Sequence, residues 1–360
     1  MPASQIVSPR GATLGAPLRL HEMDLSIFFA GTAGSVPSAR RGLPALLLRR
    51  GGESLLFDCG EGTQRQLLRS VGLANMDAVF ITHFHADHWL GLPGMLKSFA
   101  LRERGEPLTV YGPRGLRELM QTMRVIYGRL PYALEIEELE PMQTVRGEGY
   151  GVVAIAVSHS REHCLGYAVV EDERPGEFDP RAAQQLGVQP GPDFGRLQRG
   201  EEVAGVHPQQ VMGAARQGRK IVISGDTSPC ETLALAAHEA DVLVHEATFA
   251  EDESERARQT GHSTARQAAM LARDAHVRML ALTHVSSRYA GGELREEARE
   301  VFAATESPRD FDTIEVPFPE RGGAQLVRWS ERQAAERSAQ GGGELTPDAR
   351  EPVREAVAPS

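Results

Sequence analysis

The chain of 360 residues is long enough for one large domain or two ordinary ones, and its 41% hydrophobic content is typical of a protein with a sizeable core. No apolar run approaches the roughly 20 residues of a membrane-spanning helix, so no membrane association is expected. The formal net charge of −10 argues on its own against a nucleic-acid partner. The cysteines are few and widely spaced, which argues against a disulfide framework and favours the reducing cytoplasm: Cys59, Cys164 and Cys230.

The two ends of the chain differ in composition from its middle. Residues 1–22 are rich in Pro, Gly, Ser and Ala, lack the apolar segment of a secretory signal, and are predicted to be a loose extension. Residues 331–360 are polar and contain a triple glycine, so they cannot bury enough apolar surface to order themselves and are predicted to be a disordered tail. The intervening residues 23–330 are predicted to form the functional domain.

Within this middle part, apolar strands alternate with helical segments and end in polar residues. The stretch "LSIFFAG" comes first, and "LPALLLRRGGESLLFDCGEG" follows as a hairpin that turns at Gly51-Gly52 and ends at Asp58. Helical segments are expected at residues 95–104 and 262–275. Alternating strands and helices indicate an α/β layered domain, in which the strand ends converge on one edge. Later strands end at His159, Asp226, Glu246 and His284.

The stretch "HFHADH" directly follows the buried strand "DAVFIT". Positions i and i+2 of an extended segment point the same way, so His83 and His85 can share one ion. Asp87 and His88 follow after a turn and can serve a second ion. Imidazole and carboxylate together suit zinc, with manganese or iron possible. A surface histidine cluster or an incidental zinc site is the alternative. Two ions need further ligands, for which the strand-end residues His159, Asp226 and His284 are candidates.

The histidine motif and its downstream His, Asp and His resemble the metallo-β-lactamase superfamily, whose members are four-layer αβ/βα sandwiches with a di-zinc cleft. Seven stretches between Met23 and Trp329 resemble one member family, ribonuclease Z, in the same order: "LLFDCGEGTQRQL", "HFHADHWLGLPGML", "SHSREHCLGYAVVEDERPGEFD", "GRKIVISGDT", "VHEATF", "GHSTARQAA" and "LTHVSSRY". The resemblance implies a zinc-dependent endoribonuclease that removes the 3′ trailer from precursor tRNA. It would leave a 3′-hydroxyl on the tRNA and a 5′-phosphate on the trailer.

The resemblance also implies the site. Two Zn²⁺ per subunit are expected, with Mn²⁺ possible, one bound by His83, His85 and His159, the other by Asp87, His88 and His284, and both bridged by Asp226. Asp87 would also act as the general base. His262 would protonate the leaving group and would be oriented by Glu246. Asp58 is expected to fix a metal-bound imidazole and to bind no metal itself.

A Pro/Gly-rich insertion at about residues 172–205 resembles the exosite arm with which this family grips the tRNA body. The candidate contacts in it are Gly191, Pro192, Arg196 and Arg199, and the arginines would offset the acidic net charge locally. Near the N-terminus, "PSARRG" matches the family's Pro-x-Lys-x-Arg-Asn loop at Pro37 and Arg41, which makes Arg41 a substrate-binding candidate. Ala39 and Gly42 replace the lysine and the asparagine, so the response to an encoded CCA end is open.

Two other functions stay possible on sequence grounds. One is a different phosphodiester or arylsulfate hydrolase of the same superfamily, which would lack the arm. The other is an RNA- or zinc-binding protein whose site has decayed, although every expected ligand is present. A homodimer is expected from the family resemblance alone.

Overall fold

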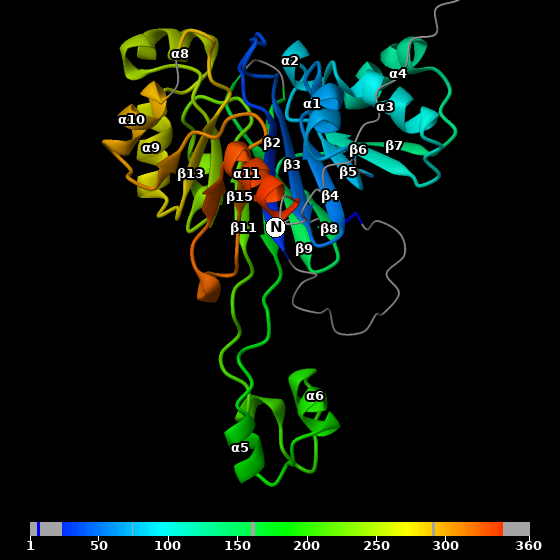
Figure 1. Ribbon diagram of the computed structural model, residues 1–360, viewed down its shortest axis with the longest axis vertical. Helices are drawn as coiled ribbons and strands as arrows, with labels where there is room; N and C mark the ends of the chain where they lie inside the picture. Colours follow the sequence, from blue (N-terminus) through cyan, green and yellow to red (C-terminus); the bar gives the residue numbers. More distant parts are fainter. Residues whose placement is uncertain (1–5, 8–23, 74, 160–162, 290–291, 341–360) are drawn as a thin grey trace, which may run out of the picture.

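The computed structural model describes residues 6–7, 24–73, 75–159, 163–289 and 292–340. Two eight-stranded sheets lie at its centre, with helices on both sides (Figure 1). In spatial order, the first sheet consists of β1 (Ile6–Val7), β8 (Thr144–Gly147), β9 (Tyr150–Ala156), β10 (Leu165–Glu171), β11 (Lys220–Ile223), β12 (Val242–Glu246), β13 (Leu280–Thr283) and β14 (Thr305–Glu306). The second consists of β16 (Gln325–Val327), β15 (Thr313–Glu315), β2 (Leu25–Gly31), β3 (Ala45–Arg50), β4 (Glu53–Phe57), β5 (Ala78–Phe80), β6 (Leu108–Gly112) and β7 (Leu134–Glu138).

Each sheet buries one face against the other sheet and its second face against helices. The core between the sheets joins residues of both, such as Phe57 with Tyr167 at 5.7 Å between ring centroids. A second core lies beneath α1 (Thr63–Arg69), α3 (Leu92–Leu101) and α4 (Leu116–Tyr127). A third lies beneath α7 (Glu231–Ala237), α9 (Ala265–Asp274) and α10 (Glu293–Arg299), and α8 (Ser254–Thr260) precedes α9. The predicted four-layer αβ/βα sandwich is therefore confirmed.

The local signals in the sequence correspond to these elements. The hairpin turns at Gly51, whose φ of 55° suits glycine, and β3 pairs with β4 from Leu46↔Phe57 to Arg50↔Glu53. Helix α9 begins after Thr264, whose side chain accepts from the Gln267 backbone in a capping box. Strands β4 to β7 run parallel, as do β11 to β14. Their carboxyl ends therefore meet at one edge of the molecule. No helix in the described ranges is long and apolar enough to cross a membrane.

The ends of the chain are partly described. Within the predicted extension of residues 1–22, Ile6–Val7 form β1, which pairs in parallel with β8. Within the predicted tail of residues 331–360, the first ten residues continue α11 (Trp329–Gln340). The remaining parts of both predictions lie outside the described residues.

The segment between β10 and β11 leaves the sheets and projects from the edge opposite α1 and α8 (Figure 1). It covers residues 172–219, of which our predicted arm at 172–205 is the first part. Two extended stretches form its stalk, with bridges Arg174↔Arg216 and Phe178↔Met212. Its head contains α5 (Pro180–Gln185) and α6 (Pro192–Gln198), which pack around a small apolar core of Ala183, Val188, Leu197, Val203, Val206 and Val211. We call residues 172–219 the arm.

A buried ion-pair cluster fixes the base of the arm. Glu171 accepts from Arg219 Nε at 2.7 Å and Nη2 at 2.8 Å, and from Arg50 Nε at 2.9 Å. The guanidinium groups of Arg174 and Arg219 lie 3.6 and 3.9 Å from the ring centroid of Phe318. Burial raises the pKa of Glu171, but hydrogen bonds and charge from Arg219 lower it by more, so the net shift is downward.

Replacing Glu171 by glutamine is expected to destabilise the fold by about 3–5 kcal/mol at neutral pH, because it removes the carboxylate that pairs with the buried Arg219 guanidinium. The wild-type carboxylate stabilises the fold above its unfolded pKa, near 4.5, and this contribution is lost as pH falls through the lowered folded pKa. The difference between wild type and Glu171→Gln should therefore shrink below pH 4.5. Urea unfolding across a pH series measures this difference.

The control is Glu255→Gln, which removes a carboxylate from an exposed pair with Arg258. It should leave the urea midpoint unchanged. Equal effects of the two substitutions at neutral pH would contradict a special role of the buried cluster.

Candidate metal centre and catalytic pair

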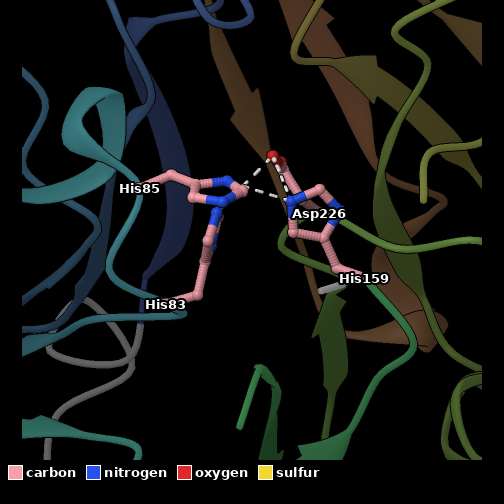
Figure 2. A group of neighbouring side chains, drawn as sticks. All are labelled: His83, His85, His159 and Asp226. Carbon is pink, nitrogen blue, oxygen red and sulfur yellow. Dashed lines mark hydrogen bonds and ion pairs between the residues drawn. The ribbon is translucent and has the colours of Figure 1, made fainter. Parts of the chain in front are cut away.

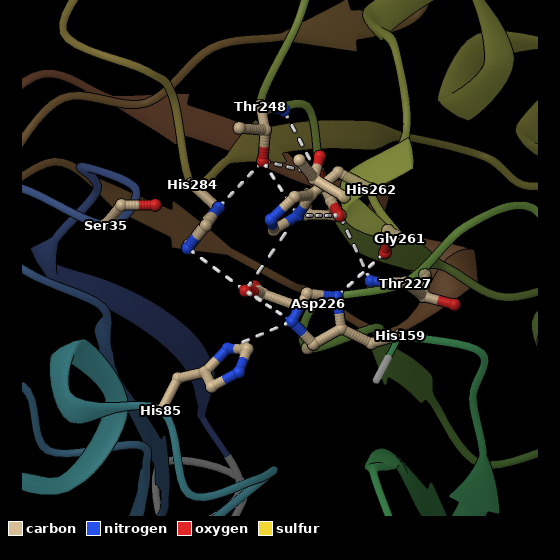
Figure 3. A network of polar contacts seen from close by, with 12 residues as sticks. Ser35, His85, His159, Asp226, Thr227, Thr248, Gly261, His262 and His284 are labelled. Atoms are coloured by element: carbon tan, nitrogen blue, oxygen red, sulfur yellow. Dashed lines mark hydrogen bonds and ion pairs between the residues drawn. The ribbon is translucent and has the colours of Figure 1, made fainter. Parts of the chain in front are cut away.

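The predicted metal ligands come from five places in the chain that meet at the carboxyl-end edge of the two sheets. His83 and His85 follow β5, and the four-residue helix α2 (Ala86–Trp89) adds Asp87 and His88. His159 follows β9, Asp226 follows β11 and His284 follows β13. Figures 2 and 3 show five of these side chains pointing toward one another: His83, His85, His159, Asp226 and His284. His284 has a φ of 54°, an uncommon conformation for a residue with a Cβ and one that often marks functional sites.

Asp226 lies at the centre of this cluster and is 97% shielded from solvent. Its Oδ2 lies 3.3 Å from Nε2 of both His88 and His284, 3.7 Å from that of His83, and 3.8 Å from that of His159. On one side of it, His83, His85 and His159 offer ligand atoms within 4.8 Å of one another, and Asp87, His88 and His284 do so on the other. The single carboxylate thus lies between two sets of three ligands.

Three imidazoles are oriented by hydrogen bonds to their Nδ1 atoms. His88 Nδ1 lies 2.7 Å from Asp58 Oδ2, His159 Nδ1 lies 2.8 Å from the carbonyl of Gly261, and His284 Nδ1 lies 2.8 Å from Thr248 Oγ1. A hydrogen bond at one ring nitrogen fixes the tautomer and leaves the other nitrogen as a lone-pair donor. All three Nε2 atoms face Asp226, and the structure places Asp58 behind His88, away from the cluster's centre.

The polar atoms at the centre lack the partners that a metal-free protein would need. His83 Nε2 and Asp226 Oδ1 are buried and have no hydrogen-bond partner within the described residues. Burial, the largest effect, lowers the pKa of both His83 and His159, which favours the neutral imidazole that binds a metal. Unpaired buried acceptors are costly in a protein interior unless an ion satisfies them. The donor set therefore fits a metal cofactor.

His262 and Glu246 form a second unit beside the metal ligands. His262 Nδ1 lies 2.7 Å from Glu246 Oε1 and 3.2 Å from Thr248 Oγ1, while Nε2 forms no hydrogen bond to the described residues. Glu246 is held in turn by the backbone N–H groups of Thr227 and Thr248. Burial lowers the pKa of His262, but the Glu246 carboxylate raises it by more, to about 9. The imidazole is thus a charged donor whose free nitrogen is available for proton transfer.

Residues not singled out in the sequence complete the site. The hydroxyl of Thr248 contacts Glu246, His262 and His284 together, and Ser35 N donates to Asp87 Oδ2 at 2.8 Å. The signal for Thr248 was its place two residues after Glu246, at the end of a buried strand. Nothing in the sequence marked Ser35. Only contacts between distant segments bring it to the site.

Gly34 packs against His284 so closely that a Cβ there would lie 2.6 Å from its Nδ1 and 2.8 Å from its Cε1. Replacing Gly34 by alanine should displace the imidazole and lower hydrolytic activity roughly 10²-fold, the loss that a misplacement of about 1 Å can cause. Rates on a nitrophenyl phosphodiester, together with metal content, measure the effect.

Gly52→Ala is the matched control, because no atom lies within 4 Å of a Cβ at that hairpin position. It should keep full activity. A fully active Gly34→Ala variant would contradict the tight packing of His284.

The predicted substrate contacts lie in two separate regions. Gly191 and Pro192 begin α6 in the head of the arm. In the same head, Arg196 pairs with Glu201 at 3.0 Å and with Asp193 at 3.3 Å, and Arg199 pairs with Glu201 at 3.1 Å. Arg41 lies in the loop after β2, where its Nη1 donates to Thr32 Oγ1 at 2.6 Å. In this structure the two arm arginines are thus engaged by acidic neighbours.

Comparison with known proteins identifies the class first. The family model described as "Metallo-beta-lactamase superfamily" matches residues 42–252, more than half of the chain. Curated relatives include ribonuclease Z of Gemmatimonas aurantiaca, 47% identical over 83% of this chain and 98% of the relative, and that of Myxococcus xanthus, 46% identical over 82% and 98%. The solved structure of the short form of human tRNase Z is 30% identical, with a TM-score of 0.60, over 81% of this chain and 99% of that one. This chain belongs to the ribonuclease Z family of that superfamily.

Proposed function

We propose that this protein is the metal-dependent endoribonuclease that removes the 3′ trailer from precursor tRNA. The observation that carries this proposal is the convergence of seven metal-competent residues with the His262–Glu246 pair, in a chain 41–47% identical to curated ribonuclease Z proteins. The name of the human neighbour, tRNase Z, points to the same substrate. The products would be a tRNA with a 3′-hydroxyl and a trailer with a 5′-phosphate.

We further propose that the cofactor is a pair of Zn²⁺ ions, with Mn²⁺ as the alternative. His83, His85 and His159 would hold one, Asp87, His88 and His284 the other, and Asp226 both, since its Oδ2 lies between the two sets. Imidazole nitrogen and carboxylate oxygen are suitable zinc ligands. Bound ions would supply Lewis acidity toward the phosphate oxygens and toward the attacking water.

The chain's own residues would then move the protons. Asp87, oriented by Ser35 N, would accept a proton from the attacking water as that water bonds to phosphorus. His262 would donate its Nε2 proton to the ribose 3′-oxygen as the phosphorus–oxygen bond breaks. Glu246 would hold the imidazole through Nδ1 and stabilise its charge. Asp58 would keep His88 in the tautomer that presents Nε2.

The position of the arm supports a homodimer. The arm leaves from Glu171 and returns at Lys220, at the end of β11 opposite Asp226, so it points away from its own metal centre (Figure 1). A tRNA gripped by this arm would reach a site more readily on a second subunit. We therefore propose that one subunit's arm serves the other's site, through contacts that include Gly191 and Pro192. A cytoplasmic location stays our prediction from the small number and wide spacing of the cysteines.

A competing function is the hydrolysis of small phosphodiesters or arylsulfates on the same fold. The 48-residue arm, with its own apolar core, has no use in such a reaction, so the structure favours a macromolecular substrate. Incubation with a precursor tRNA carrying a 3′ trailer, followed by mapping of both new ends, tests the proposal. Cleavage at the tRNA 3′ end with the stated end groups supports it, and an intact precursor in the presence of zinc contradicts it.

Removing the head of the arm should separate RNA binding from chemistry. Gly213 N donates to the Glu177 carbonyl at 2.8 Å, so residues 178–212 can be replaced by an Asn-Gly turn that keeps this bond and the Arg174↔Arg216 bridge of the stalk. The kcat/KM for precursor tRNA should fall roughly 100-fold, as expected when several phosphate contacts are lost. The rate on a nitrophenyl phosphodiester should stay within about twofold of wild type, because the metal centre lies at the opposite edge. An equal fall in both rates would mean that the arm supports the fold.

A further inference from the structure

A pocket lined by arginines lies beside the metal centre. It is bounded by the loop Pro37–Gly42, by α1 and its preceding turn, and by Arg309–Phe311, and its volume is about 630 Å³. The loop leads to it directly from the site, since Ser35, two residues before Pro37, donates its N–H to Asp87. A group bound in this pocket would therefore lie next to the bond that the metal centre cleaves.

The pocket is basic in a protein that is acidic overall. Five arginines line it, against Glu61 and Asp310 as its acidic residues: Arg40, Arg41, Arg65, Arg69 and Arg309. The carboxylate of Asp310 is already engaged, because it accepts from Gly42 N and Gln66 Nε2, both at 2.6 Å, and from Thr32 Oγ1 at 2.7 Å. These bonds tie the loop to α1 and give the pocket a fixed floor.

The exposed arginines of the pocket differ from most others in the described residues. Arg174, Arg266 and Arg288, for example, each form an ion pair with a glutamate at 2.7–3.0 Å. Within the described part of the chain, no ion pair is formed by the side chains of Arg40, Arg65, Arg69 or Arg309. Arg69 lies over the ring of Phe311 at 5.5 Å, which holds its guanidinium toward the pocket. The pocket thus keeps planar cationic groups free for an external anion.

We propose that this arginine pocket binds backbone phosphates of the RNA next to the cleaved bond and so sets the register of cleavage. This inference rests on the proposed function and extends it to Arg40, Arg65, Arg69 and Arg309 as positioning residues. Guanidinium forks match phosphate oxygens in geometry and charge. A net charge of −10 repels RNA from most of the surface, so a local cationic pocket would direct the chain of phosphates toward the metals.

The test is the double substitution Arg65→Gln/Arg69→Gln in the metal-loaded protein. Both side chains are on the exposed face of α1, so folding should be unaffected. The KM for precursor tRNA should rise roughly tenfold, as charge-assisted contacts are lost. Anisotropy with labelled mature tRNA should show that the slope of log K against log salt falls in magnitude by about 1.4–1.8, the value for two phosphate contacts. End mapping should show cleavage at additional positions.

Arg124→Gln/Arg129→Gln is the matched control. It removes the same charge from exposed arginines on α4 and the loop after it, which also form no ion pair within the described residues. It should change neither KM nor the salt slope. The proposed role of the pocket is wrong if the control raises KM as much as Arg65→Gln/Arg69→Gln does. It is also wrong if Arg65→Gln/Arg69→Gln loses as much activity on a nitrophenyl phosphodiester as on precursor tRNA. If wild type leaves precursor tRNA intact, the proposed function fails, whereas the mature-tRNA binding data still decide whether the pocket binds RNA.

Discussion

Replacing Asp226 by alanine is expected to strip the metal cofactor and to abolish hydrolysis of precursor tRNA and of a nitrophenyl phosphodiester together. The reason is geometric: one carboxylate oxygen lies 3.3–3.8 Å from Nε2 of four histidines, which belong to both ligand sets. Both rates should fall by at least about 10⁴-fold, since in the proposed mechanism bound metal would supply Lewis acidity toward the phosphate and the attacking water. Elemental analysis of metal per chain, with both rate assays, measures the result.

Asp274→Ala is the control, because it removes an exposed carboxylate of α9 that pairs with Arg273. It should retain full metal content and both rates. Circular dichroism should show that the Asp226→Ala variant keeps its secondary structure, because the two sheets hold their cores without this side chain. If the Asp226→Ala protein keeps the wild-type metal content and normal rates, the assignment of Asp226 as a metal ligand is wrong.

Replacing His262 by alanine should separate leaving-group protonation from metal chemistry. The imidazole is held by Glu246 at 2.7 Å and belongs to neither of the two three-ligand sets that flank Asp226, although its ligand atom also lies within 4.8 Å of those of Asp226 and His284. The rate on precursor tRNA should therefore fall by roughly 10²–10⁴-fold, the usual contribution of a positioned acid. A nitrophenolate leaves without a proton, so the chromogenic diester should lose much less. Metal content should stay at the wild-type value.

His238→Ala provides the matched control, since His238 is an exposed histidine at the end of α7 and belongs neither to the metal-ligand sets nor to the His262–Glu246 pair. It should leave both rates unchanged. If the His262→Ala protein loses metal, or loses both activities equally, His262 belongs to the metal site and the assignment of the acid is wrong. His262 also lies 4.0 Å from Asp226, which makes this measurement decisive.

Local sequence was sufficient for the parts of the molecule that depend on short-range chemistry. The turn at Gly51-Gly52 lies where the pattern predicts it, and the helix predicted at residues 262–275 is α9, whose cap at Thr264 needs only neighbouring residues. Metal ligands could be predicted in the run from His83 to His88 because two-residue spacing on an extended segment aligns side chains. His159, Asp226 and His284 could be predicted as further ligands because each follows a strand, and strands that run in the same direction bring their carboxyl ends to one edge.

Contacts between distant segments decided the rest. Thr248 bonds to His284 across 36 positions and Ser35 bonds to Asp87 across 52, and no periodicity encodes such pairs. The folded arm also brings Glu201, five and two residues further along the chain, within 3.0 and 3.1 Å of Arg196 and Arg199, while Arg40, Arg65, Arg69 and Arg309, which form no ion pair within the described residues, line one pocket. Charge in a sequence is a property of single residues, whereas its availability to a ligand depends on which opposite charges the fold brings within hydrogen-bonding distance. Only the tertiary structure sets those distances, because they depend on how the chain segments pack against one another in the fold.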